Sequence, residues 1–424
     1  MGAGAQLACS TRSRDRSMIM TSLLVCAFLC VASSSSSLNA ASLDDDVVEL
    51  ATYNTGLLPT IPRLGERFEA LLNELPKLTA DVLCLQELWT EAVLLAVVDA
   101  SSSAFPYRLR LETHDSASPP CNRDALRAAF ACAAETCPRS SAASRRVPVE
   151  LFLCALSDAN CRRKFHRLGQ RCMNCLILGP SFEFRSALFL LELPDHPFSC
   201  SEDASHSYST TNGLLLLSKR PLLNTIASNF TWTGSDDVEL ITRGYLSAEI
   251  DGVGTIVCTH LPTYYSTLEE PYIGPSQFKN IKEEHVADID VLFSRYVENR
   301  RRTHLPPVVF MGDFNHGPVI GQSVAAEFPE LFQEVIERGY VSTPATRREG
   351  CSYCKSNSIV PRDYLPGTET NASTSAVGVL IDHVYFPSEI DFDYLEIKKL
   401  DVSSEGPLSD HYGISVSFCI RGTV

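Results

Sequence analysis

Several apolar segments of this 424-residue chain end beside a side chain that can bind a metal ion or transfer a proton. These side chains are Asn54 at the end of Val47–Asn54, Glu87 after Asp81–Gln86, His260 after Thr255–Thr259, Asp313 and Asn315 after Val308–Met311, Asp382 within Val377–Phe386, and Asp410 and His411 before Tyr412–Phe418. Carboxylate and amide oxygens suit Mg²⁺, Mn²⁺ or Ca²⁺ rather than zinc. A hard cation beside a proton-transferring histidine is suited to phosphoester hydrolysis, because the cation neutralises phosphoryl oxygens while a base activates water.

Each of these residues, taken singly, has a simpler explanation. A carboxylate at the end of a strand is commonly a solvated terminus or a helix cap, and a histidine there is commonly exposed or hydrogen-bonded. The set predicts a site, because α/β folds gather functional groups where strands end along one edge of a sheet. The sequence has no G-x-S-x-G elbow, no Gly-rich phosphate loop with its lysine and no H-E-x-x-H pair.

The elements that must position these side chains follow from the spacing of apolar residues. Strands are predicted at Val47–Asn54, Asp81–Gln86, Tyr107–Glu112, Gly213–Ser218, Gly244–Ile250, Thr255–His260, Pro307–Met311, Val377–Phe386, Leu395–Leu400 and Tyr412–Phe418. Helices are predicted at Arg63–Leu78, Ser276–Glu298 and Glu327–Arg338. Because strands outnumber helices and the two are interleaved, we expect an α/β or α+β core with mixed sheets.

One stretch, residues 113–207, interrupts this alternation. It is rich in Ala, Cys and Arg and has short helical patterns at Arg123–Glu135 and Cys161–Leu168. We therefore expect a Cys-rich helical insertion within a domain that otherwise spans residues 41–424.

Cysteine usage indicates an oxidising compartment. Ten of the 16 cysteines lie outside strand-like runs and outside the N-terminal leader, and eight of these ten fall between Cys121 and Cys200, which predicts a disulfide-stapled region. Zinc is the alternative for Cys172/Cys175 and Cys351/Cys354, but neither C-x-x-C has the second, suitably spaced pair of a four-cysteine zinc site. Three cysteines in apolar strands are expected to be buried free thiols: Cys84, Cys258 and Cys419.

Residues 1–40 have the features of a secretory signal peptide. Arg12, Arg14 and Arg16 precede a short apolar run, Leu23–Ala32, and small residues follow. A membrane anchor is the alternative, but a span needs about 20 apolar residues. We expect a protein that is secreted or held in the lumen of the secretory pathway, with glycosylation acceptors at two asparagines, Asn229 and Asn371.

The charge balance limits the partners. The chain carries 36 Lys+Arg and 51 Asp+Glu, a net charge of −15, which disfavours a constitutive polyanion-binding surface. An acidic enzyme can still approach phosphates through a bound metal ion. The 45% hydrophobic and 21% charged residues suit a packed globular core.

An ordered series of motifs resembles the endonuclease/exonuclease/phosphatase superfamily: Tyr53-Asn54, Gln86-Glu87, Thr259-His260-Leu261, Gly312-Asp313-Phe314-Asn315, Ile381-Asp382 and Ser409-Asp410-His411-Tyr412. The resemblance spans the chain from Tyr53 onward except the insertion. Within the superfamily, Asp81–Trp89 and Asn212–Pro221 are similar to the neutral sphingomyelinase branch. Pancreatic-type deoxyribonucleases carry an arginine shortly after the Gln-Glu pair, where this chain has Leu88-Trp89.

The resemblance implies a four-layer sandwich of two mixed β-sheets flanked by helices, and it implies roles for the motif residues. Glu87 would be the principal Mg²⁺ ligand (Mn²⁺ or Ca²⁺ being alternatives), with Asn54 beside it and Asp410 completing the shell. Asp313 would activate water, and Asn315 would orient the phosphate or a second metal. His411, also near the metal, would be the general base, His260 would hold a phosphoryl oxygen or help the leaving group, and Asp382 would buttress a histidine.

Two departures from the family pattern concern the substrate. Some members have a carboxylate just before the strand at Gly213, where this chain has Thr210-Thr211-Asn212. Bacterial neutral sphingomyelinases have a membrane-engaging aromatic hairpin between the GD-x-N motif and the late Asp, where this chain has the Cys351/Cys354 loop without paired aromatics. Transient contact with a membrane surface therefore stays open.

The sequence predicts a secreted, Mg²⁺-dependent phosphodiesterase that hydrolyses sphingomyelin or a related phospholipid. A secreted endonuclease acting on nucleic acid is the first alternative. The second is a non-catalytic binding protein that uses the insertion, although the intact set of ligand candidates argues against it. No protein partner is inferred.

Overall fold

The computed structural model describes residues 47–58, 61–112, 121–137, 154–156, 158–169, 172–173, 175–176, 212–231, 242–263, 277–298, 307–344, 350–360, 377–390, 393–400 and 406–419. The predicted signal peptide and Asn371 lie outside these ranges. Among the described helices, none is both long and apolar enough to cross a membrane.

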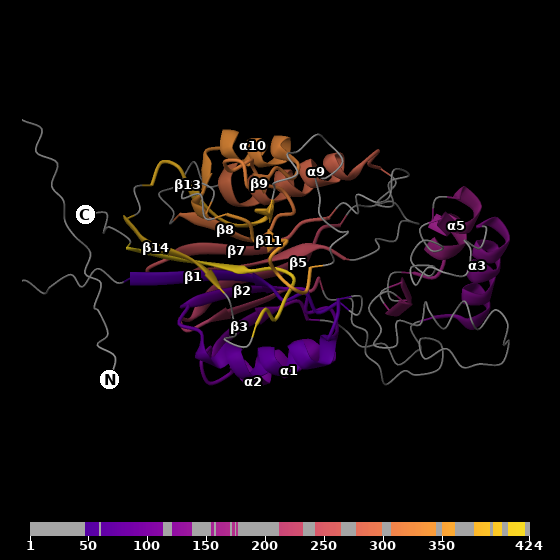
Figure 1. The fold of residues 1–424 in the computed structure, drawn as a ribbon, viewed down its shortest axis with the longest axis horizontal. Coiled ribbons are helices and arrows are strands. Elements are labelled where there is room, and N and C mark those ends of the chain that lie inside the picture. Colours follow the sequence, from indigo (N-terminus) through magenta and orange to yellow (C-terminus); the bar gives the residue numbers. More distant parts are fainter. Residues whose placement is uncertain are drawn as a thin grey trace, which may run out of the picture.

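Two mixed β-sheets of six strands each lie at the centre of the molecule (Figure 1). In sheet order, the first contains β14 (Asp393–Leu400), β15 (Gly413–Cys419), β1 (Val47–Asn54), β2 (Val82–Gln86), β4 (Leu215–Ser218) and β3 (Tyr107–Arg110). The second contains β10 (Tyr340–Ser342), β13 (Asp382–Pro387), β8 (Val308–Asp313), β7 (Gly254–His260), β6 (Gly244–Ile250) and β5 (Leu222–Asn229). One pair in each sheet is parallel, β1–β2 and β7–β8, and the other pairs are antiparallel.

Helices cover the outer face of each sheet and complete the four layers that the family resemblance predicted (Figure 1). The first sheet is covered by α1 (Leu64–Glu74), a 3₁₀ turn at Leu75–Lys77 and α2 (Glu91–Ser101). The second is covered by α9 (Ile281–Phe293), a π-helical turn at Ser294–Glu298 and α10 (Pro329–Glu337). The α/β sandwich of two mixed sheets is confirmed.

Strand alternation explains the layers. In β1, Val48 and Leu50 belong to the core between the sheets, while Ala51 and Tyr53 pack with the helices on the other face. Successive strand side chains point to opposite faces, so a continuously apolar strand is buried on both. This period of two also decides which face each polar residue at a strand end occupies.

Part of the predicted insertion forms a separate helical unit. It includes α3 (Arg123–Thr136) and α5 (Ala159–His166), capped by the side chains of Asn122 and Asp158, and it has its own apolar core. In Figure 1 these helices lie apart from the sandwich. Disulfides were predicted for this region without their pairing, and those that the structure shows between described residues of the unit are Cys121–Cys172, Cys132–Cys161 and Cys137–Cys154.

The prediction of free thiols at Cys84, Cys258 and Cys419 is wrong. Cys84 on β2 and Cys258 on β7 form a disulfide between the two sheets, 174 residues apart in sequence, and Cys419 is also disulfide-bonded. The apolar pattern of a strand indicates that it is buried, but not which strand of the opposite sheet it faces. The sequence therefore could not predict that Cys84 pairs with Cys258. Cys351 and Cys354 are bonded to each other, so this C-x-x-C is a disulfide rather than half of a zinc site.

A small third sheet was not predicted. The expected strand Val377–Phe386 divides into β12 (Gly378–Val379) and β13, and β12 joins β11 (Tyr353–Cys354) and β9 (Val324–Ala325). Gly378 makes this close packing feasible, because a Cβ there would lie 2.2 Å from the carbonyl oxygen of Tyr353. The third sheet brings the Cys351–Cys354 disulfide next to the polar ends of the central strands.

Candidate active site

Four of the predicted polar residues, Asn54, His260, Asp313 and Asp382, occupy the inward-facing end positions of strands from both sheets. Along each strand, the polar residues begin two positions beyond the last apolar residue that faces the core between the sheets, so they point to the same face as that residue. The inward series are Leu50–Thr52–Asn54 in β1, Cys84–Gln86 in β2, Cys258–His260 in β7, Met311–Asp313 in β8 and, read backward, Val384–Asp382 in β13. The strand registers pair His260 and Asp382 with Asp313, so the site lies at one end of the inter-sheet core.

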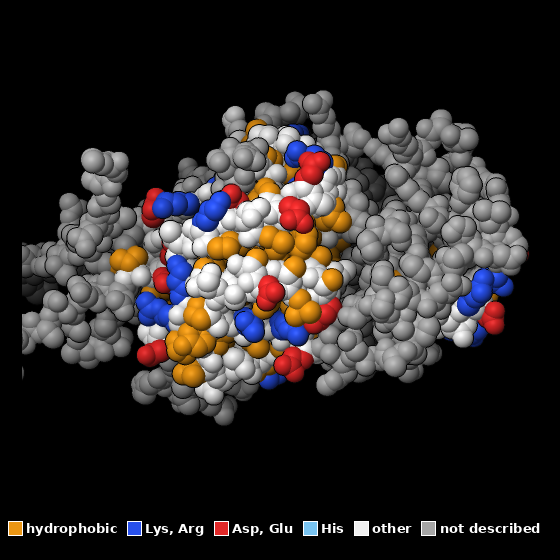
Figure 2. Space-filling view, turned by 90° about the horizontal axis from the view of Figure 1, so that it is seen from below, with side chains coloured by type: hydrophobic (Ala, Val, Ile, Leu, Met, Phe, Trp, Pro, Cys, Tyr) orange, Lys and Arg blue, Asp and Glu red, His pale blue; other side chains and the backbone are white. Residues whose placement is uncertain are grey.

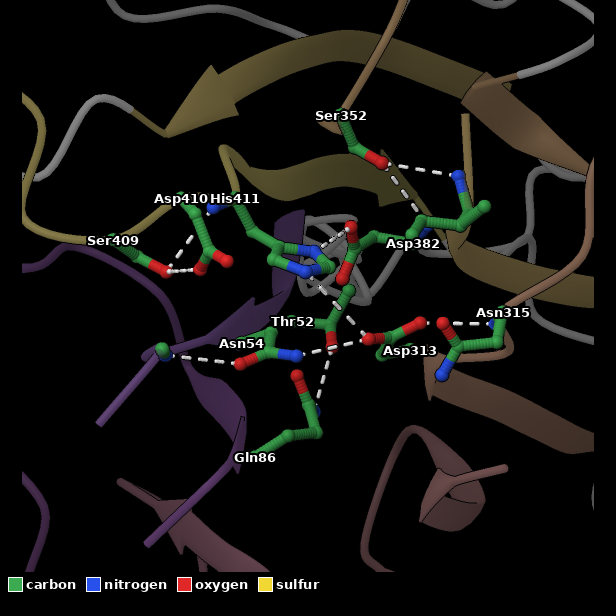
Figure 3. A network of polar contacts seen from close by, with 12 residues as sticks. Thr52, Asn54, Gln86, Asp313, Asn315, Ser352, Asp382, Ser409, Asp410 and His411 are labelled. Atoms are coloured by element: carbon green, nitrogen blue, oxygen red, sulfur yellow. Dashed lines mark hydrogen bonds and ion pairs between the residues drawn. The ribbon is translucent and has the colours of Figure 1, made fainter. Parts of the chain in front are cut away.

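The Asn54 side chain links the two sheets. Its Nδ2 donates to Asp313 Oδ2 at 2.9 Å, and its Oδ1 accepts from the Gly56 backbone (Figure 3). The same Nδ2 donates to Glu87 Oε1 at 3.2 Å. Glu87 follows the end of β2 in the left-handed region, at φ 66°, which a non-glycine residue adopts at some cost. The carboxylates of Glu87 and Asp313 therefore meet on either side of one amide nitrogen.

Asp313 is the centre of the site. Its Oδ2 lies 3.9 Å from His411 Nε2, and its Oδ1 accepts from the backbone N–H of Asn315 at 2.9 Å (Figure 3). The same Oδ2 lies 3.3 Å from His260 Nε2. The Asn315 side chain donates to the carbonyl of Leu261 at 2.9 Å and ties the ends of β7 and β8 together.

His411 is oriented by Asp382. Its Nδ1 lies 2.8 Å from Asp382 Oδ2, so its Nε2 faces Asp313. The ligand atoms of Asp313, Asp382 and His411 all lie within 4.8 Å of one another, close enough to share an ion. A carboxylate bonded to Nδ1 fixes the tautomer and leaves Nε2 for chemistry.

Asp410 approaches from the loop before β15. A Cβ at Gly56, whose φ is 57°, would lie 2.4 Å from Asp410 Oδ1, so glycine makes this approach feasible. Ser409 donates its hydroxyl to Asp410 Oδ1 and accepts the backbone N–H of His411. All eight residues predicted for the site are thus brought to one end of the sandwich: Asn54, Glu87, His260, Asp313, Asn315, Asp382, Asp410 and His411.

Burial shifts the protonation of the acids. Burial, and then the charge of Asp410, raise the pKa of Glu87. Burial, and then the charge of Asp382, raise the pKa of Asp313 to about 7. Both shifts reflect closely spaced carboxylates removed from water.

The two histidines respond in opposite directions. Burial and the positive charge of Arg243 lower the pKa of His260 well below its ordinary value, so its contact with Asp313 joins a neutral ring to the carboxylate. For His411, burial alone would lower the pKa, but the charge and hydrogen bond of Asp382 outweigh burial and raise it well above the ordinary value.

Exposure indicates the side from which the site is reached. Glu87, Asn315, Asp410 and His411 each keep 7–8% of their surface exposed, while Asn54, His260, Asp313 and Asp382 keep 0–1%. The first group forms the rim of the site and the second its floor.

Residues 51–411 match the family described as the Endonuclease/Exonuclease/phosphatase family. The chain belongs to this family. It is accordingly a phosphoric diester hydrolase that depends on a divalent metal ion.

Solved structures with similar folds include other endonuclease/exonuclease/phosphatase proteins. D. rerio TDP2 complexed with single-strand DNA product is 14% identical, sphingomyelinase C from Streptomyces griseocarneus 15% and SmcL 10%. Each similarity covers 88% of this chain and 99% of the other, with a TM-score of 0.44. Similarity at this level carries no information about substrate. No curated protein matches the sequence.

The side chains of the site fit a divalent cation. Glu87 Oε2 and Asp382 Oδ1 are buried without a hydrogen-bond partner, which is costly for a carboxylate oxygen unless a cation or water binds it. Four carboxylates lie beside two imidazoles, and none of the side chains is a thiolate. Such a donor set suits a hard ion.

Sequence reasoning missed the residues that support the site. Arg67 on α1 is 2% exposed and donates to four backbone carbonyls: those of Thr55, Gly56, Pro62 and Leu408. It thereby ties the end of β1 to the segment before Asp410. In the sequence Arg67 is only a polar residue between apolar helix positions, so no local signal distinguishes it from a solvated side chain.

Proposed function

We propose that the protein is a secreted, Mg²⁺-dependent phosphodiesterase that hydrolyses sphingomyelin or a related phospholipid. The observation that carries the proposal is the junction at Asp313 Oδ2, where Asn54, His260 and His411 from both sheets meet beside Glu87. A site with these groups can activate water next to a phosphodiester.

Each side chain has a proposed role. Glu87, Asn54 and Asp410 would hold Mg²⁺, which when bound neutralises phosphoryl oxygens and acidifies water. Asp313 orients the attacking water, and Asn315 orients the phosphate. His411 would accept the proton of that water at Nε2, because its Nδ1 is bonded to Asp382 and because the positive charge of a bound cation would lower the pKa that the surrounding carboxylates raise. Neutral His260 donates a hydrogen bond to a phosphoryl oxygen or to the leaving group.

Two observations support a lipid rather than a nucleic acid. The first concerns the position where pancreatic-type deoxyribonucleases carry an arginine. This chain has Leu88 and Trp89 there, and their side chains are only 0% and 2% exposed. The Arg243 guanidinium lies 5.2 Å from the Trp89 ring centroid. On the face formed by α1 and α2, acidic and basic side chains are interspersed (Figure 2), so the described part of this face offers no continuous basic surface.

Secretion is supported by the predicted signal peptide and by the disulfides. Several disulfides in one chain are expected of a protein that folds in an oxidising compartment. Treatment with a glycosidase that removes N-linked glycans, applied to protein secreted from cultured cells, tests the localisation together with glycosylation at Asn229.

The substrate is tested by incubating purified protein with sphingomyelin liposomes, plasmid DNA or RNA, in Mg²⁺ or in EDTA. We expect lipid turnover that EDTA abolishes and that Glu87→Gln lowers by about 1000-fold. Glu66→Gln is the matched control, because the Glu66 side chain lies on α1 and is 77% exposed. Nicking of DNA without lipid turnover would replace the proposal by the nuclease alternative, and a folded protein inactive on all three substrates would favour the binding-protein alternative.

A further inference from the structure

The Cys351–Cys354 disulfide loop (residues 351–354) contacts both members of the Asp382–His411 pair. The disulfide closes a turn whose ends are three residues apart, with a Cα–Cα distance of 5.4 Å. Asp382 begins β13 and His411 precedes β15, which belong to different sheets. The loop therefore lies where the two sheets must be held in register for the pair to form.

Ser352 holds the Asp382 side of the pair. Its buried hydroxyl accepts the backbone N–H of Ile381 at 3.0 Å and that of Asp382 at 3.1 Å (Figure 3). Its own N–H donates to the carbonyl of Val379 at 3.0 Å. Two backbone donors on one hydroxyl fix the direction in which the Asp382 side chain leaves the chain.

The same loop holds the His411 side. The Ser352 carbonyl accepts the backbone N–H of Tyr412 at 2.8 Å, and Tyr353 forms an antiparallel bridge with His411. The ring centroids of Tyr353 and His411 are 5.2 Å apart at an interplanar angle of 63°. Just beyond the loop, Asn357 donates its side-chain amide to the carbonyl of Ser409 at 2.8 Å.

We propose that the Cys351–Cys354 loop is a positioning device for the Asp382–His411 pair, with Ser352 and Tyr353 as positioning residues. Ser352 sets the backbone of Asp382, Tyr353 packs against the imidazole of His411, and the disulfide keeps the two side chains on one rigid turn. The consequence is that Nε2 of His411 faces Asp313. This inference rests on the role proposed above for His411 and assigns a function to a loop outside the set of proposed metal ligands.

The alternative is that the loop only stabilises the fold, and the two ideas differ in what a mutation changes. A positioning residue acts on the chemical step, so its loss lowers kcat and leaves KM and the Mg²⁺ requirement unchanged. Supporting groups of this kind typically contribute 10–100-fold. Loss of stability alone lowers the amount of folded enzyme without changing the turnover of the folded molecules.

The test compares Ser352→Ala with Ser101→Ala. Both serines are fully buried, but Ser101 lies on α2 and its hydroxyl donates only to helix carbonyls. With bis(p-nitrophenyl) phosphate as a general diester probe, we expect Ser352→Ala and the double variant Cys351→Ala/Cys354→Ala to lower kcat of folded enzyme by about 10-fold or more at unchanged KM. Ser101→Ala should stay within about twofold.

A readout independent of turnover separates this inference from the proposed function. The imidazole NMR signals of His411, assigned by their loss in His411→Asn, should shift in Ser352→Ala and not in Ser101→Ala. If wild-type enzyme hydrolyses no diester, the proposed function fails while the NMR comparison still tests the loop. Wild-type kcat and unshifted signals in Ser352→Ala would overturn the inference. If that variant does not fold, Tyr353→Ala against Tyr107→Ala, at an exposed position of β3, provides the same comparison.

Discussion

At the residue scale, the site holds several carboxylates close to one another and buried from water. One amide nitrogen, Asn54 Nδ2, donates to both Glu87 and Asp313, and Asp382 is paired with Asp313 on the neighbouring strand. Such an arrangement is unfavourable without a cation, because desolvation and mutual repulsion both disfavour the charged forms. The site therefore costs stability in the absence of metal.

Glu87→Gln tests this cost. The folded-state pKa of Glu87 is raised by burial and then by Asp410, so above its unfolded pKa the ionised side chain destabilises the folded state. In EDTA at pH 8, the neutral isostere should raise Tm by about 2–4 °C, although in Mg²⁺ the same variant should lower turnover by about 1000-fold. Thermal unfolding in EDTA measures the effect, and a lower Tm would show that Glu87 is stabilised by neighbours rather than strained.

His285 on α9 gives a pH dependence away from the metal ligands. Burial, and then the charge of Arg243, lower its pKa to about 3, so the folded state keeps it neutral while the unfolded chain protonates it near 6.5. The free energy of unfolding that depends on a neutral His285 is therefore fully present above pH 6.5, and it is lost as the pH falls from 6.5 toward 3. In His285→Gln, the slope of unfolding free energy against pH between 4 and 6 should fall by about 1.4 kcal/mol per unit. Chemical denaturation at several pH values measures this slope, and an unchanged slope would contradict the prediction.

At the element scale, regular strands were predictable and irregular or polar elements were not. The predicted strand at Val47–Asn54 matches β1, and the predicted helix Ser276–Glu298 contains the shorter α9 followed by a π-helical turn. The strand β5 was missed, because its sequence LLNTIASN alternates weakly and its side chains are only partly buried. The helix α2 was missed because its segment is almost uniformly apolar. Such a segment lacks the alternation of apolar and polar residues that would mark the face toward the first sheet.

The site residues at strand ends could be predicted from the same strand pattern, whereas the residues that support them could not. Residues that continue an inward-facing series into a polar side chain are visible in sequence, as with Asp313 after Met311. Residues that act through backbone groups, such as Arg67 and Ser352, depend on which loops come together and leave no pattern. The Cys84–Cys258 disulfide belongs to the same class, since it joins strands of different sheets.

Arg67 should couple fold stability to the metal site. Arg67→Met removes a buried guanidinium and leaves up to four backbone carbonyls, near the end of β1 and in the segment before Asp410, without a donor. We therefore expect the free energy of unfolding to fall by about 3 kcal/mol or more and the Mg²⁺ concentration required for activity to rise. Arg163→Met, at an exposed position of α5, is the control. Denaturant unfolding and Mg²⁺ titration of activity measure the two effects. Equal stability of the two variants would mean that water satisfies those carbonyls.

At the scale of the whole molecule, the insertion leaves and rejoins the sandwich beside the site. β3 and β4 are antiparallel neighbours, with Arg110 paired to Leu215, and Leu215 is also paired to Leu85, two residues before Glu87. On its return the chain passes Gly213, whose carbonyl accepts the backbone N–H of Leu88 at 3.0 Å and whose Cα lies against the Trp89 ring. Topology thus anchors both ends of the insertion at the edge of the sheet that carries the metal ligands.

We predict that the insertion is a cap that restricts which substrates reach the site. Among the described residues, its apolar core shares no member with the three large cores of the sandwich, so the sandwich should fold without it. Joining Glu112 to Tyr208 leaves nine residues between Arg110 and Leu215, enough to close the β3–β4 hairpin. The deletion should keep hydrolysis of bis(p-nitrophenyl) phosphate and shift the ratio of plasmid nicking to sphingomyelin turnover by about 10-fold or more. Because Cys132→Ala/Cys161→Ala opens a disulfide within the insertion without removing it, this control should change the ratio less. A folded deletion variant with an unchanged ratio would show that the insertion does not select substrate.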